Sequence, residues 1–69
     1  NDEKNAIMIA ENLIKTKGFE DVILFVNNGN VTAIVKAESL DENQVAQIQN
    51  IVTRELNVQV AKINVSNQK

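Results

Sequence analysis

The chain has 69 residues, of which 43% are hydrophobic, and its seven basic and nine acidic side chains leave a formal net charge of −2. It contains no Cys, His, Trp, Tyr or Pro, which excludes disulfides, thiolate or imidazole metal ligands and His-based catalysis. The scattered charges provide no basic patch for nucleic acid, so one small domain with an aliphatic core and no cofactor is expected.

The first predicted element is an amphipathic helix over about residues 2–17. Its apolar residues fall within one stripe of about 160° when successive residues are turned by ~100°; they are Ala6, Ile7, Ile9, Ala10, Leu13 and Ile14. Gly18 is expected to end the helix in a left-handed conformation, with Phe19 folding back on Ile14.

A β-hairpin is predicted next. The apolar, β-branched run from Val22 to Val26 is typical of a strand, and Asn28-Gly29 suits a two-residue turn that returns the chain through residues 31–37. Counting outward from the turn pairs 26 with 31, 24 with 33 and 22 with 35 on the core face. The opposite face then pairs 25 with 32 and 23 with 34, and it ends in a charge pair between Asp21 and Lys36.

A second helix and a third strand complete the pattern. Asp41 is the expected N-cap, and Gln44 closes a capping box that precedes an apolar stripe of Val45, Ile48, Val52 and Leu56, with Ile51 at its margin. The helix is expected to end near Asn57. A short packed loop and a strand over about residues 62–66 follow.

The resulting fold class is α+β, in the order α-β-β-α-β, with two helices packed on one face of a three-stranded sheet. Because the first strand is apolar on both faces, it is the predicted central strand, with the third strand on its free side and residues 30–36 forming one edge. The other face of the sheet has no covering layer of its own.

The predicted partner-binding residues are Met8, Ile23, Phe25, Ile34 and Arg54. The three strand residues form an apolar patch on the uncovered face, unless a terminus or residues 58–61 cover them. Met8 is expected to be exposed on the first helix, as a contact or by chance, and Arg54 is either solvated or forms a salt bridge to a partner. The acidic pairs 2–3, 20–21 and 41–42 are adjacent in sequence and diverge, so no enzyme activity is expected.

Two segments resemble a known family. Residues 10–21, A-E-N-L-I-K-T-K-G-F-E-D, are similar to the A-E-x-L-I-K-x-K-G-[FY]-E-D start of the stage III sporulation protein AH domain. Residues 45–55, V-A-Q-I-Q-N-I-V-T-R-E, resemble its V-A-Q-I-x-x-I-V-x-R-E helix, and residues 61–63 suit its final strand.

The resemblance implies a ring-building-motif fold and a role in sporulation. Residues 1–69 would be a single extracytoplasmic assembly domain that lacks an N-terminal membrane anchor. Family members are held in the mother-cell membrane around the forespore, project this domain into the intermembrane space and bind stage II sporulation protein Q. With other stage III sporulation proteins they are thought to build an oligomeric ring or channel that joins the two cells.

Two other classes share parts of this pattern. A small-molecule-sensing, ferredoxin-like regulatory domain also packs helices on one face of an antiparallel sheet, but it normally has a fourth strand. An RNA-binding αββαβ module needs aromatic and basic residues on the sheet face, where this chain offers Phe25 and Lys36.

Overall fold

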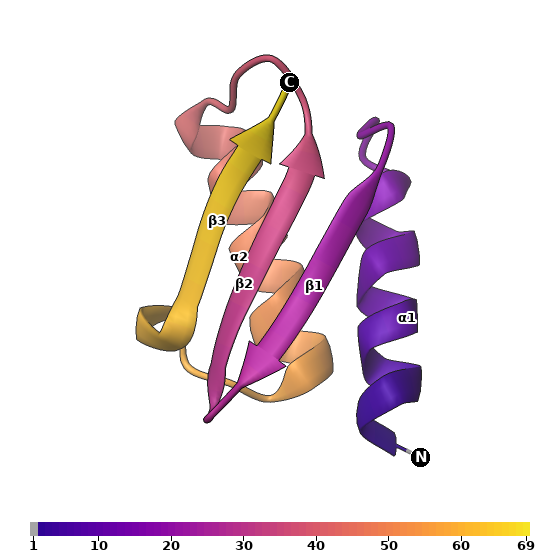
Figure 1. The fold of residues 1–69 in the computed structure, drawn as a ribbon, viewed down its shortest axis with the longest axis vertical. Coiled ribbons are helices and arrows are strands. Elements are labelled where there is room, and N and C mark those ends of the chain that lie inside the picture. The colour runs from indigo at the N-terminus through magenta and orange to yellow at the C-terminus, as the bar shows by residue number, and fades with distance from the viewer. Residues whose placement is uncertain (1) are drawn as a thin grey trace.

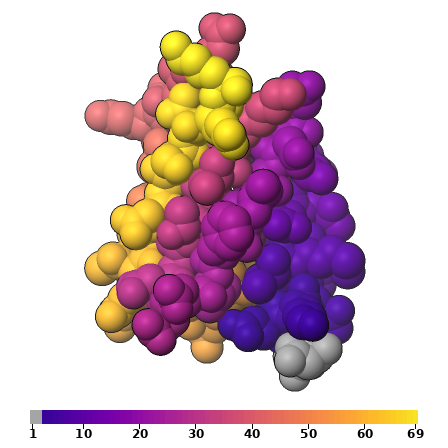
Figure 2. All heavy atoms as spheres, in the orientation of Figure 1, coloured from indigo at the N-terminus to yellow at the C-terminus, as the bar shows by residue number. Residues whose placement is uncertain are grey.

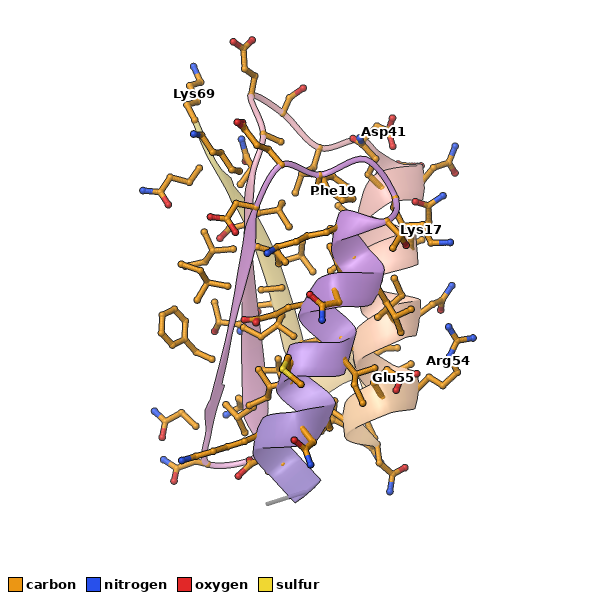
Figure 3. All side chains as sticks on the ribbon, turned by 90° about the vertical axis from the view of Figure 1, so that its right-hand side faces the viewer. Lys17, Phe19, Asp41, Arg54, Glu55 and Lys69 are labelled. Atoms are coloured by element: carbon orange, nitrogen blue, oxygen red, sulfur yellow. The ribbon has the colours of Figure 1, made fainter. Side chains whose placement is uncertain are left out.

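A computed structural model describes residues 2–69 and contains the predicted elements in the predicted order (Figure 1). The elements are α1 (Asp2–Lys15), β1 (Val22–Asn27), β2 (Asn30–Lys36), α2 (Glu42–Leu56), a 3₁₀ turn η1 (Val60–Lys62) and β3 (Ile63–Gln68). Both helices lie on the same side of the sheet (Figures 1 and 3). The predicted fold class, two helices on one face of a three-stranded sheet, is therefore confirmed.

The end of α1 follows its sequence signals. Gly18 has a φ of 105°, and its N–H donates to the Lys15 carbonyl at 3.1 Å, which closes the last turn. Ile14 is fully buried and Phe19 is 7% exposed, and both belong to the core. The assignment of Ile9 to the core stripe is wrong, because its side chain is 45% exposed. Ile9 lies at one margin of the stripe, about 160° around the helix from Glu11, and the flank of Glu11 is the one that meets β1.

The β1–β2 hairpin has the predicted register. Asn28 and Gly29 form the turn with φ values of 54° and 78°, and the strands pair as Val26↔Val31, Leu24↔Ala33 and Val22↔Val35. The predicted charge pair between Asp21 and Lys36 does not form. Their main chains are hydrogen-bonded at 2.9 Å, while the Lys36 ammonium lies 3.8 Å from Glu20 and the Asp21 carboxylate 3.7 Å from Lys15.

The predicted strand order is wrong. The sheet order is β1-β2-β3, so β2 is central and β1 is an edge strand, and β3 runs parallel to β2. The connection through α2 explains this order. A right-handed crossover that starts from β2 most simply places the next parallel strand directly beside β2. Figure 1 shows this unit, with α2 behind β2 and β3. Residues 30–36 are therefore not an edge.

The start and end of α2 agree with the prediction. The Asp41 carboxylate accepts the Gln44 N–H at 2.8 Å, the Gln44 side chain accepts the Asp41 N–H at 3.0 Å, and Asn57 ends the helix with a φ of 57°. The capping box is thus complete. The buried core under the sheet combines both helices and all three strands; its residues are Ala10, Ile14, Phe19, Val22, Leu24, Val31, Ala33, Val35, Ile48, Ile51, Val52 and Ile63.

Candidate interaction surface

The side of the sheet that faces away from the helices is an uncovered surface, here called the open face. Figure 2 views the molecule from this side, with the strands in front. Ile23 is 46% exposed and Phe25 is 55% exposed, whereas Ile34 is half-buried. Ile23 pairs directly with Ile34, and Phe25 pairs with Thr32, so these side chains are neighbours on one surface. Neither the C-terminal residues nor residues 58–61 bury this patch.

The open face changes character from one edge of the sheet to the other. Its β1 side is apolar, whereas the register of β3 places polar, uncharged side chains next to those of β2; the pairs are Thr32↔Asn64, Ile34↔Ser66 and Lys36↔Gln68. At one end the face is hollowed by a shallow depression of about 230 Å³, lined by Asp21, Val22, Ile23, Ile34, Lys36, Gln68 and Lys69. The face therefore offers an apolar area beside a polar strip, as protein contact surfaces do.

The two remaining predicted contact residues lie elsewhere. Met8 is 54% exposed on α1. Arg54 extends from α2 on the side opposite to the sheet (Figure 3), with its side chain 69% exposed and its Nε 3.8 Å from the neighbouring Glu55 carboxylate. An exposed ion pair of this length contributes little to stability. The structure therefore brings Ile23, Phe25 and Ile34 together, and it leaves Met8 and Arg54 outside that group.

A second hollow, of about 450 Å³, lies at the end of the molecule where the hairpin turn meets the start of α1 and the end of α2. Its lining residues are Glu3, Ala6, Val26, Gly29, Val31, Glu55, Leu56 and Val58. This set holds two carboxylates, those of Glu3 and Glu55, and otherwise apolar side chains and one glycine. Among the side chains of residues 3–69, no group of three or more acidic residues is placed to hold a metal ion.

Sequence reasoning missed two carboxylates that act on the edge strand β1. The Leu24 N–H donates to the Glu11 carboxylate of α1 at 3.1 Å, and the Val22 N–H donates to the Asp21 carboxylate at 2.9 Å. Glu11 lies beside the apolar stripe of α1, on the flank that meets β1. Its position in the sequence indicates a polar flank residue, but only the packing of α1 against β1 identifies its partner.

No helix in the described part of the chain is long and apolar enough to span a membrane. Comparison with curated protein sequences gives no significant match. The model of the SpoIIIAH-like protein family matches residues 1–65. Among solved structures, one described as "Structure of the SpoIIQ-SpoIIIAH pore forming complex" is similar with a TM-score of 0.72 and 21% sequence identity. The likeness covers 96% of this chain and 55% of that chain, so this chain spans about half the length of its structural relative. The chain thus belongs to the SpoIIIAH-like protein family.

Proposed function

We propose that this chain is a complex-forming domain of a sporulation protein, which binds a protein of the SpoIIQ type and helps to build the channel or ring between mother cell and forespore. The observation that carries the proposal is the family match over residues 1–65. The structural relative is described as part of a SpoIIQ–SpoIIIAH pore-forming complex, which names the class of partner. The open face, with Ile23 and Phe25 about half exposed, is a surface suited to such a contact.

The wider setting is part of the same proposal. The domain lies in the intermembrane space, and an N-terminal membrane anchor outside this sequence holds it at the mother-cell membrane around the forespore. It acts without catalysis, and it contacts further stage III sporulation proteins and other copies of itself. A single contact need not be strong, because many copies held on one membrane add their contacts together.

The other two function classes have less support. A ferredoxin-like sensing domain normally has a fourth strand, whereas the sheet within residues 2–69 has three. An RNA-binding sheet face needs several stacking rings and cations. Here Phe25 is the single exposed ring of the open face, and Lys36 is engaged by Glu20 at 3.8 Å.

The first test is co-purification of the chain with the ectodomain of the SpoIIQ-type protein from the same organism, followed by size determination of the complex. A stable complex is expected. Failure of the unmodified chain to bind that ectodomain, under conditions in which both proteins are folded, would contradict the proposed function.

The role of the open face is tested by two variants that differ mainly in position. Ile23 on the open face is 46% exposed and Ile9 on α1 is 45% exposed, so Ile23→Glu and Ile9→Glu introduce the same charge at equally accessible isoleucines. Ile23→Glu is expected to weaken binding of the SpoIIQ-type ectodomain at least ~tenfold, because a carboxylate would be desolvated in an apolar contact. Ile9→Glu is the control and is expected to retain this binding. Equal behaviour of the two variants would exclude the open face as the contact surface.

A further inference from the structure

The two edges of the sheet differ in how their outward main-chain groups are satisfied. On β1, the hydrogen bond from the Lys36 N–H to the Asp21 carbonyl makes these two residues a hydrogen-bonded pair. Such pairs alternate along an antiparallel ladder. The N–H groups that point away from β2 are therefore those of Val22, Leu24 and Val26. Two of these three donors are occupied by side-chain carboxylates, those of Asp21 and Glu11.

The outer edge of β3 is open by comparison. The Ala37 N–H donates to the Gln68 carbonyl at 3.0 Å, so Gln68 faces β2. By alternation, the main-chain groups of Ile63, Val65 and Asn67 point outward. The Ile63 N–H is used locally by the Val60 carbonyl. The outward N–H groups of Val65 and Asn67, and the outward carbonyls of the same residues, have no hydrogen-bond partner among residues 2–69.

This open edge also lacks the usual protection against strand pairing. Exposed edges are commonly protected by charged side chains, Pro or a bulge. The β3 sequence INVSNQ contains no charge and no Pro, and its register with β2 is continuous from Ile63 to Gln68. The Asn67 side chain donates to the carbonyls of Ala37 and Glu38 at 3.0 and 2.9 Å, which holds the end of the strand in place. The edge is therefore preformed and has no bulge that would interrupt pairing with an added strand.

We propose that the outer edge of β3 binds an extended segment of the protein partner, which adds to the sheet as a fourth strand. The partner is taken to be a different protein, because the structural relative is described as a complex of two different proteins and because head-to-tail pairing of copies would need the β1 edge, where Asp21 and Glu11 occupy the donors. Two copies could still join through their β3 edges, and sedimentation of the free chain separates that outcome from binding of a partner. The inference rests on the proposed function, and it takes the SpoIIQ-type protein as the source of the added segment.

The neighbouring side chains define the chemistry of that segment. On the helix side, an added strand would lie next to Ile63 and Val65 and would extend the core, which favours apolar residues. On the open face it would lie next to Asn64, Ser66 and Gln68, which favours small polar residues. The inferred ligand is thus an alternating apolar and polar segment of about five residues, held mainly by main-chain hydrogen bonds.

A matched pair of proline variants tests the edge. Val65 on β3 and Val26 on β1 are both half-buried valines whose side chains pack against the core. The main-chain N–H group of each points away from β2, at an outer edge of the sheet. Pro removes an outward donor and places its ring in the path of an added strand, without removing a ladder hydrogen bond to β2. Val65→Pro is expected to weaken binding of the SpoIIQ-type ectodomain by about tenfold or more, and Val26→Pro by less than about threefold. Circular dichroism of both variants checks the fold.

Amide hydrogen exchange gives a second readout on the unmodified chain, should Val65→Pro fold poorly. The amides of Val65 and Asn67 are expected to exchange rapidly in the free chain and to become protected in the complex, while the Val26 amide stays unchanged. A complex in which Val65 and Asn67 remain unprotected, or whose affinity survives Val65→Pro, would overturn the edge proposal and leave the proposed function intact. If the amides of Val65 and Asn67 are protected without any partner and sedimentation shows dimers, the edge pairs two copies of the chain. That result would also overturn the edge proposal.

Discussion

The hydrogen bond between α1 and the edge of the sheet makes a quantitative prediction for Glu11→Ala. The Glu11 carboxylate accepts the Leu24 N–H at 3.1 Å in a partly buried position, and the bond joins residues that are 13 apart in sequence. Truncation to Ala removes the acceptor and leaves an edge N–H beside the apolar packing of α1 on β1. The variant is therefore expected to lose both stability and the closure of this edge.

The magnitude follows from the type of bond and its burial. A hydrogen bond to a charged group contributes roughly 1.5–3 kcal/mol, and partial access of water to the freed N–H favours the lower end. Because Ala has a higher helix propensity than Glu, the substitution also stabilises the helix by a few tenths of a kcal/mol. A net loss of about 1–1.5 kcal/mol in the free energy of unfolding is expected. In a domain of this size, that corresponds to a fall in Tm of about 4–10 °C.

Thermal and urea denaturation, followed by circular dichroism, measure this loss. Glu11→Gln keeps an oxygen acceptor without the charge and is expected to lose about half as much. Asn12→Ala changes an exposed residue in the same turn of α1 and serves as the control. If Glu11→Ala melts within about 2 °C of the Asn12→Ala control, the bond does not stabilise the fold and the reasoning is refuted.

Three further predictions concern stability, and urea denaturation measures each of them. Asp41→Ala removes the 2.8 Å bond to the Gln44 N–H and is expected to cost about 1 kcal/mol; an unchanged midpoint would contradict the capping box. Ile48→Ala, at a fully buried position, is expected to cost about 2–5 kcal/mol, whereas Ile23→Ala, at a side chain 46% exposed, costs less than about 1 kcal/mol. Equal losses would refute the assignment of the two faces. Gly29→Ala meets no atom within 4 Å, so its expected cost of about 1 kcal/mol comes from the φ of 78° alone; full stability would contradict the turn geometry.

Local signals predicted most of the fold correctly. The Asn28-Gly29 turn determines the register of the whole hairpin, because a two-residue loop allows one pairing and each further pair follows by alternation. The Asp41 capping box begins α2 and the left-handed Asn57 ends it, and both are local features of the sequence. These features depend on residues within about four positions of each other, and sequence alone contains that information.

Strand order depends on long-range packing, and the sequence was misleading there. The run from Val22 to Val26 is apolar on both faces, which is typical of a central strand, yet Ile23 and Phe25 are exposed on an edge strand. The central strand β2 carries the smaller alternating core residues Val31, Ala33 and Val35, each fully buried. The apolar outer face of β1 was therefore a signal of the candidate contact surface rather than of a central position.

The same long-range packing determines which edge of the sheet can pair with another chain. In Glu11→Ala, the outward N–H groups of Leu24 and Val26 are both unoccupied, on a strand whose residues 22–26 carry no charge. Such a segment on an open edge readily pairs with another strand. Because the edge of β3 is also open, this variant is expected to associate head to tail with rising concentration, whereas the unmodified chain remains a monomer. Sedimentation velocity over a concentration series measures this, and adding Val65→Pro to Glu11→Ala is expected to restore the monomer. A Glu11→Ala variant that stays monomeric at every concentration would show that this carboxylate does not close the β1 edge.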